Sequence, residues 1–127
     1  MIKSILMVGV GSFLGGALRY LLSTVIKSAA GNGFPWGTLA VNLAGCFLFG
    51  VVYAIFAKMA SQGCNLYLLL TTGVLGGFTT FSAFTHEAFL MLQSGNHCGF
   101  ISYVAASVGV GLLLLALGYF SVSCVVR

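Results

Sequence analysis

Residues 76–82 read Gly76-Gly77-Phe78-Thr79-Thr80-Phe81-Ser82, and they lie in the middle of an apolar run that extends from 66 to 93. As one continuous α-helix, this run of about 28 residues would be roughly 42 Å long, whereas the hydrocarbon core of a bilayer is about 30 Å thick. Glycines hold a helix poorly, and hydroxyl side chains can satisfy the backbone groups that a break releases. We therefore predict a membrane helix that breaks near residues 76–80.

The composition places the rest of the chain in the membrane as well. Of 127 residues, 60% are hydrophobic and only 5% are charged, whereas a soluble domain carries about 25% charged residues. Three further apolar runs are each long enough to cross a bilayer. We predict an all-α integral membrane protein with helices at about 4–28, 36–58, 66–93 and 99–126, which form a single transmembrane domain over residues 1–127.

The few charges are scattered along the chain. A net charge of +4 without a basic patch argues against nucleic-acid binding. With the N-terminus in the cytoplasm, Lys3, Lys58 and Arg127 would lie inside and Lys27 outside, which is a small bias under the positive-inside rule. The chain could therefore insert in both orientations, and simple insertion with both termini inside is the alternative.

The first apolar run raises two further questions. Lys3 followed by apolar residues is similar to a signal peptide, but no cleavage site follows, so we predict a retained helix. Gly11 and Gly15 form a Gly-x-x-x-Gly pair, a spacing that lets membrane helices approach closely. The pair could serve packing within one subunit or an interface between subunits.

Cysteines and histidines give weak signals for metal binding. The four cysteines form no Cys-x-x-Cys pair, and Cys64 and Cys98 fall in loops that we expect on opposite faces of the membrane. His86 and His97 could ligate haem or a metal, which would make the chain a membrane anchor or haem subunit. Isolated histidines are more often structural.

Ionisable groups inside a membrane helix are costly and therefore indicate function. Arg19 lies deep in the first run, where it could attract anions or bond helix-end carbonyls. Glu87 is the only acid, and it could pair with a base, carry protons or face a water-filled vestibule.

Uncharged polar groups and aromatic rings could bind an ion stripped of its water. Thr38 and Asn42 share a helix face at i, i+4, and Asn42 offers two donors and an acceptor. Phe81 and Phe84 are spaced i, i+3, and the edges of phenyl rings are positive. Hydroxyl donors surround them, namely those of Thr80, Ser82 and Thr85. Helix–helix contacts for Asn42 and core packing for the phenylalanines are the alternatives.

The sequence offers no catalytic constellation. A single acid cannot form a carboxylate pair, and no Ser/His/Asp or Cys/His arrangement provides an activated nucleophile. We predict that the protein is not an enzyme.

Three segments, in order along the four predicted helices, carry a family resemblance over essentially the full length. They read Gly15-Gly16-Ala17-Leu18-Arg19-Tyr20, Gly37-Thr38-Leu39-Ala40-Val41-Asn42-Leu43-Ala44-Gly45 and Thr71-Thr72-Gly73-Val74-Leu75-Gly76-Gly77-Phe78-Thr79-Thr80-Phe81-Ser82-Ala83-Phe84. The chain resembles the Fluc/CrcB family of bacterial fluoride channels.

The resemblance implies a passive, fluoride-selective channel of the bacterial inner membrane that exports cytoplasmic fluoride. It also implies an antiparallel, dual-topology homodimer with two pores along the subunit interface. A structural Na⁺ at the dimer centre would be held by the backbone carbonyls of Gly76 and Thr79.

The resemblance also assigns roles to side chains. A polar track on the fourth helix is expected, and Tyr103 and Ser107 fit it at i, i+4, but Gly111 stands where a third hydroxyl is expected. Arg19 and Glu87 would lie at the vestibule. The expected pore residues are Phe81, Phe84, Asn42, Thr80, Ser82, Thr38, Tyr103 and Ser107.

A dual-topology, proton-coupled exporter of the small multidrug type is the alternative function. It would share the four short helices and the weak charge bias. Such exporters are similar to one another in a glutamate on the first helix, where this chain has Arg19 and no acid.

Overall fold

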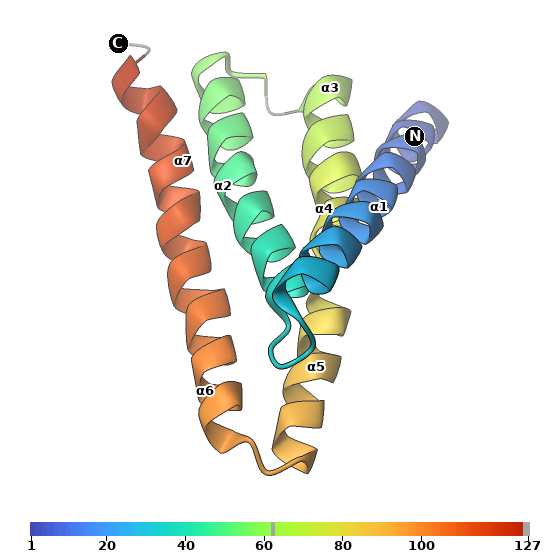
Figure 1. The fold of residues 1–127 in the computed structure, drawn as a ribbon. Coiled ribbons are helices and arrows are strands. Elements are labelled where there is room, and N and C mark those ends of the chain that lie inside the picture. Colours follow the sequence, from blue (N-terminus) through green and yellow to red (C-terminus); the bar gives the residue numbers. More distant parts are fainter. Residues whose placement is uncertain (62, 126–127) are drawn as a thin grey trace.

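The computed structural model describes residues 1–61 and 63–125, and the helices in this part of the chain form four segments of membrane-spanning length (Figure 1). The first two are α1 (Ile2–Ala30) and α2 (Trp36–Lys58). The third comprises α3 (Asn65–Leu68), the π-helix η1 (Leu69–Leu75), α4 (Gly76–Phe78) and α5 (Phe81–Gln93). The fourth comprises α6 (His97–Ala105), the π-helix η2 (Ala106–Val110) and α7 (Gly111–Val125).

These segments confirm the prediction of an all-α, multi-pass membrane protein with four spanning helices. The observed spans extend over 2–30, 36–58, 65–93 and 97–125, so the predicted ends are displaced by at most two residues. Position 126, where we expected the last helix to end, lies outside the described residues. The two π-helices were not predicted, because the wider turn of a π-helix leaves no visible mark in segments that are apolar on nearly every face.

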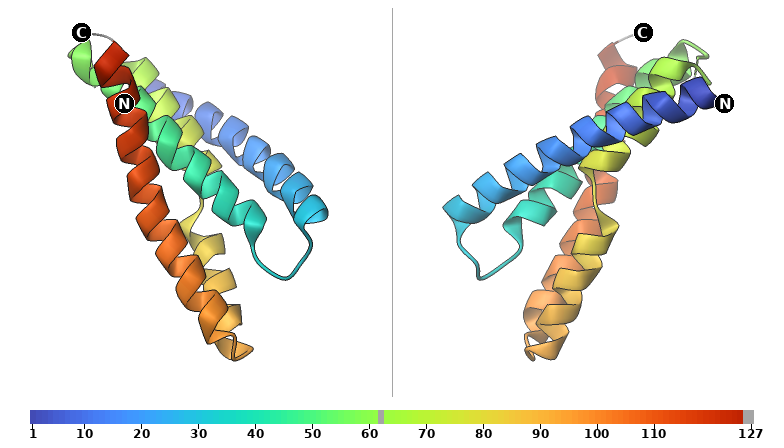
Figure 2. Two further views of the ribbon diagram at one scale, coloured as in Figure 1. Left: turned by 60° about the vertical axis from the view of Figure 1, so that its left-hand side comes forward. Right: turned by 90° about the vertical axis from the view of Figure 1, so that its right-hand side faces the viewer.

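The helices do not pack as one parallel bundle. α2 packs along α7, and α1 crosses η1 and α4, whereas α5 contacts α6. The right-hand view of Figure 2 shows the consequence: α1 and the lower leg of α5 and α6 diverge from the crossing point. The second half of the third span therefore leaves α1 and joins the fourth span.

The predicted break near residues 76–80 is confirmed. Thr79 (φ −82°, ψ 157°) and Thr80 (φ −147°, ψ 119°) are both extended, while Gly76–Phe78 and the residues from Phe81 onward are helical. Two extended residues redirect the chain, which is why α5 swings away from α1.

The crossing of α1 over the third span depends on glycines. A Cβ on Gly11 would lie 2.8 Å from Cα of Gly73, and one on Gly15 would collide with the carbonyl oxygen of Val74. Backbones can approach this closely only where no side chain intervenes. The Gly11/Gly15 pair thus serves packing within one chain, the first of the two readings left open by the sequence.

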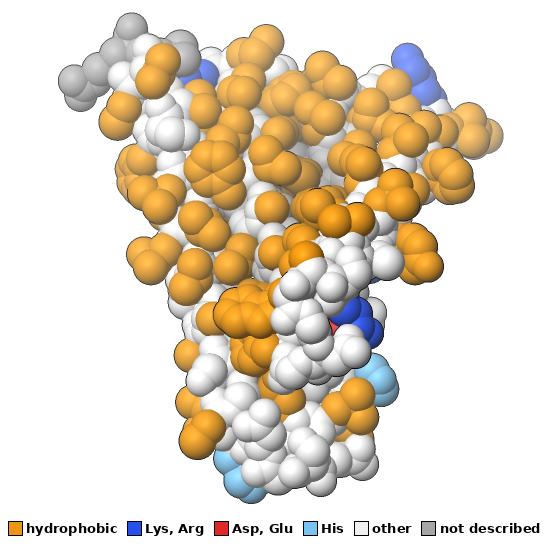
Figure 3. Space-filling view, viewed as in Figure 1, with side chains coloured by type: hydrophobic (Ala, Val, Ile, Leu, Met, Phe, Trp, Pro, Cys, Tyr) orange, Lys and Arg blue, Asp and Glu red, His pale blue; other side chains and the backbone are white. Residues whose placement is uncertain are grey.

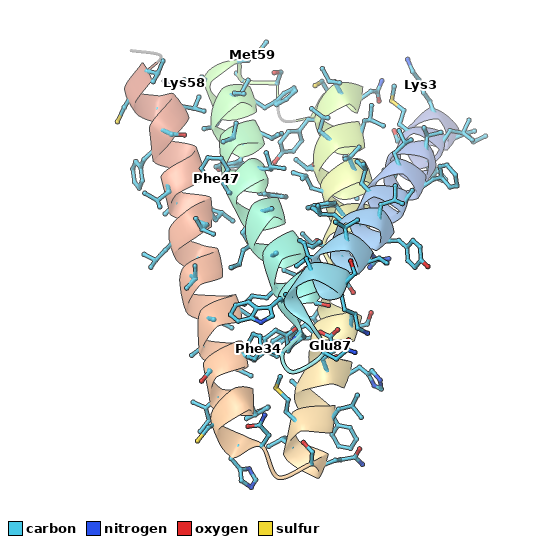
Figure 4. All side chains as sticks on the ribbon, in the orientation of Figure 1. Lys3, Phe34, Phe47, Lys58, Met59 and Glu87 are labelled. Atoms are coloured by element: carbon cyan, nitrogen blue, oxygen red, sulfur yellow. The ribbon has the colours of Figure 1, made fainter. Side chains whose placement is uncertain are left out.

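Two of the basic residues expected on one side of the membrane can be placed in the structure. Lys3 and Lys58 lie at the same end of the molecule (Figure 4), and Lys58 Nζ donates to the carbonyls of Val122 and Ser123 at 3.5 and 3.3 Å. Arg127, the third basic residue expected on this side, lies outside the described residues. All four cysteines have free thiols.

Candidate ion site

The helix break is held by the side chain of Asn42 on α2. Its Nδ2 donates to the carbonyl of Thr80 at 2.9 Å, and its Oδ1 accepts from the Thr80 N–H at 2.8 Å. An extended residue presents its N–H and C=O on the same side, so one amide can bond both, as in a hydrogen-bonded strand pair. Asn42 retains one further N–H, since an amide nitrogen has two.

The hydroxyl of Thr80 caps the helix that follows the break. Its Oγ1 accepts from the Ala83 N–H at 3.2 Å and lies 3.4 Å from Ser82 Oγ. Threonine is a favoured N-cap because its oxygen satisfies one of the free N–H groups of the first turn. Thr80 and Ser82 thus form a pair of hydroxyls at the start of α5.

Two carbonyls lose their helical donors as a result. In a continuous helix the Thr80 N–H would donate to the Gly76 carbonyl and the Ala83 N–H to the Thr79 carbonyl. Here Asn42 Oδ1 and Thr80 Oγ1 accept these two hydrogen bonds instead. Carbonyl oxygens released by a broken helix are suitable ligands for a small cation. Gly76 and Thr79 both line a cavity of about 390 Å³ beside the break, together with Asn42 and Phe81.

A larger cavity of about 1140 Å³, which we call the vestibule, opens between α1, the α1–α2 loop and α5. Its walls carry three charged side chains, Arg19, Lys27 and Glu87, and the polar side chains of Thr38, Thr80 and Ser82. In Figure 3 the red of the single acid lies beside the blue of a basic side chain. Two cations against one anion make the vestibule suited to attracting anions.

Glu87 is bound by two hydroxyls from neighbouring spans. Thr38 Oγ1 donates to Oε1 at 2.8 Å, and the hydroxyl of Tyr103 donates to Oε2 at 2.7 Å. Tyr103 has 0% of its surface exposed, so its hydroxyl has a fixed direction. This network ties α2, α5 and α6 together at the vestibule.

Aromatic rings continue from the break towards that network. The ring centroids of Phe81 and Phe84 are 5.7 Å apart, and those of Phe84 and Tyr103 are 5.0 Å apart. Phe81 and Phe84 therefore share a face, as their spacing predicts. Phe78 lies on the other side of the break and is buried, so it does not extend the row.

The structure places Ser107 and Gly111 farther along the fourth span. Ser107 Oγ is buried and has no hydrogen-bond partner within the described residues. It lies in η2, whose extra residue changes the register between Tyr103 and the positions that follow. At Gly111 a Cβ would lie 3.4 Å from Cys46 Sγ, so a hydroxyl there would crowd α2.

Phe34 is a site residue that sequence reasoning missed. This half-buried ring from the α1–α2 loop lies 5.5 Å from the Tyr103 ring in an edge-on arrangement, and Figure 4 shows it beside Glu87. An aromatic residue before Pro35 in a loop otherwise made of Ala, Gly and Asn was the available signal. Lys27 was also missed as a vestibule residue.

The two histidines lie apart from the polar groups at the helix break, in α5 and at the start of α6. His86 and His97 are both exposed, and no group of three or more His, Cys, Asp or Glu residues within 1–61 and 63–125 could hold a metal ion. The fold brings the polar side chains of Asn42, Thr80 and Ser82 together at the helix break. Fold and candidate site define a small multi-pass membrane protein with a cluster of polar groups at a broken helix.

The family is shown by comparison with known proteins. Residues 6–119 match the model of the CrcB-like protein family, Camphor Resistance (CrcB). The chain belongs to this family, as its resemblance to Fluc/CrcB proteins predicted.

Curated relatives of the chain carry the name "Fluoride-specific ion channel FluC". One from Phocaeicola vulgatus is 42% identical over 116 residues, which cover 91% of this chain and 95% of the relative. One from Rhizobium meliloti is 42% identical over 114 residues, covering 90% and 91%. One from Leptospira interrogans is 44% identical over 110 residues, covering 87% of each chain.

Proposed function

We propose that this protein is a passive, fluoride-selective channel that exports cytoplasmic fluoride across the bacterial inner membrane. The observation that carries the proposal is the convergence of hydroxyl donors and phenyl rings at the helix break, next to a vestibule with two cationic side chains. The family and the names of the relatives agree with it. Fluoride enters a cell as HF and accumulates in an alkaline cytoplasm, so a passive exit suffices.

The chemistry of the site suits a small, strongly hydrated anion. Hydroxyls of Thr80 and Ser82, the remaining N–H of Asn42 and the positive ring edges of Phe81 and Phe84 can replace part of its water shell. None of these donors carries a formal charge, so the anion is bound weakly enough to leave. Thr38, Tyr103 and Ser107 would continue the polar path, with Arg19 and Glu87 at its mouth.

Two copies in antiparallel orientation would complete this path. Phe81 exposes 76% of its surface, and Gly76 is also exposed. One side of the candidate site is therefore not covered by protein in the single chain. A second copy supplies that wall with the same residues, which gives two pores related by a twofold axis. The small charge bias between the two ends fits insertion in both orientations.

We also propose a structural Na⁺ at the dimer centre, held by the same residues. The carbonyls of Gly76 and Thr79 are hard oxygen ligands of the kind that alkali and alkaline-earth cations prefer. One pair from each copy would give four ligands. The bound charge would make the interior more favourable for an anion.

Fluoride efflux from proteoliposomes, followed with an ion-selective electrode, tests the proposal. Purified protein is expected to release fluoride once a potassium ionophore compensates the charge, while chloride stays inside. Protein-free liposomes are the control. The absence of fluoride efflux, or equal chloride efflux, would contradict the proposal.

No observation favours the proton-coupled exporter. Glu87, the only acid, accepts hydrogen bonds from Thr38 and Tyr103, and α1 carries Arg19 in place of an acid. A pH gradient across the proteoliposomes separates the two functions, because coupled export requires it and a channel does not.

A further inference from the structure

We propose that Asn42 creates the cation site, by taking from the Gly76 carbonyl the N–H that would otherwise occupy it. The inference rests on the proposed function for the presence of the cation. It gives Asn42 a second role besides donating to the anion. In this role Asn42 is a positioning residue, since it acts through the backbone of the third span.

The sequence around the break does not by itself prevent a continuous helix. Leu75, Gly76 and Phe78 are helical up to the break, and α5 is helical from its first residue. Restoring a continuous helix would require Thr79 and Thr80 to adopt helical dihedral angles, which would return the Thr80 N–H to the Gly76 carbonyl. Within a membrane, where water does not compete, such a bond would form unless another acceptor replaced the carbonyl.

Asn42 supplies that acceptor and, with its amide nitrogen, stabilises the extended conformation of Thr80. Its Oδ1 accepts the Thr80 N–H at 2.8 Å while its Nδ2 satisfies the Thr80 carbonyl at 2.9 Å. Both polar groups of one peptide residue are thus bound without a helix. Gly45, one turn further along α2, leaves room for the Thr79 side chain, which a Cβ at this position would strike.

The two halves of the Asn42 amide therefore have separable effects. The acceptor Oδ1 keeps the Gly76 carbonyl available to the cation, whereas the nitrogen bonds the Thr80 carbonyl and would donate its second N–H to the proposed anion. Asn42→Asp keeps an acceptor of the same shape and removes the amide donors. Asn42→Leu removes both functions at nearly the same volume.

The test is the thermal unfolding midpoint of the purified full-length protein, measured against sodium chloride concentration with N-methylglucamine chloride as the replacement salt. For the wild type we expect a saturable rise with sodium. For N42L we expect the half-maximal sodium concentration to increase by about tenfold or more, the scale typical of groups that orient metal ligands. For N42D we expect the sodium response to remain and fluoride efflux from proteoliposomes to be lost.

Circular dichroism and gel filtration establish that each variant is folded. A folded N42L protein with the sodium response of the wild type would overturn the inference. If N42L does not fold, Asn42→Ala, which also removes Oδ1 and introduces no clash, replaces it, and a wild-type sodium response in folded N42A contradicts the assignment to Oδ1. Wild-type fluoride efflux without any sodium response overturns this inference alone, whereas a sodium response without fluoride efflux overturns only the channel.

Discussion

Tyr103 shows at the residue scale how burial converts an ordinary hydroxyl into a fixed donor. Its ring is held between Phe34 and Phe84, and its hydroxyl has one acceptor, Oε2 of Glu87. The family resemblance implied a polar track on the fourth helix, which the spacing of Tyr103 and Ser107 fits, but it did not indicate this partner. A partner 16 residues away becomes a neighbour only when α5 folds back on α6, which local sequence does not reveal.

Tyr103→Phe tests this network. The change removes a hydrogen bond from one carboxylate oxygen of the half-buried Glu87, and a hydrogen bond to a charged group contributes about 1.5–3 kcal/mol. We expect fluoride efflux to fall by about tenfold, the equivalent of about 1.4 kcal/mol. Tyr119→Phe, which removes a hydroxyl away from the vestibule, is the matched control. Equal efflux from both variants would contradict a role for the Tyr103–Glu87 bond.

Arg19 provides the second prediction at this scale. As a vestibule cation it should raise the local concentration of anions, an effect that salt screens over about 10 Å at 0.1 M. Arg19→Gln is expected to slow fluoride efflux severalfold at low ionic strength and to approach the wild type at high ionic strength. Arg19→Lys, which keeps the charge, serves as control. Slowing that does not depend on salt would indicate a structural arginine.

At the scale of elements, the third span is the informative one. Its excess length and its run of glycines and threonines predicted the break, because both properties are local. The π-helices and the pairing of α5 with α6 were not predictable, since they depend on contacts made after the chain has folded. The bonds of Asn42 to Thr80 belong to the same class: the amide was recognisable as functional, but its partner was not.

The crossing of α1 with η1 and α4 yields an element-scale prediction. Gly15→Ala places a methyl group against the Val74 carbonyl, and such overpacking costs about 1–3 kcal/mol. Gly9→Ala is matched in helix and chemistry, but a Cβ there meets nothing within 4 Å. We expect a lower thermal midpoint for G15A only. Equal midpoints for the two variants would show that the crossing is less tight than described.

At the scale of the whole molecule, the orientation of the chain in the membrane can be tested. Cys98 is exposed in α6, next to the α5–α6 loop, at the end opposite the chain termini (Figure 1). In cells that carry a variant with Cys98 as its only cysteine, dual topology predicts labelling of about half of the copies by a membrane-impermeant maleimide. The other half should react only after permeabilisation. Labelling of all copies or none from outside would establish a single orientation.

We propose that one chain type forms the passive pore for fluoride. The most direct measurement is the reversal potential of the current through a planar bilayer that contains the protein, with unequal fluoride concentrations on the two sides and the opposite gradient of chloride. We predict that the current reverses at the equilibrium potential of fluoride and does not change with a pH gradient. Reversal near the equilibrium potential of chloride, or a current that requires the pH gradient, would contradict the account.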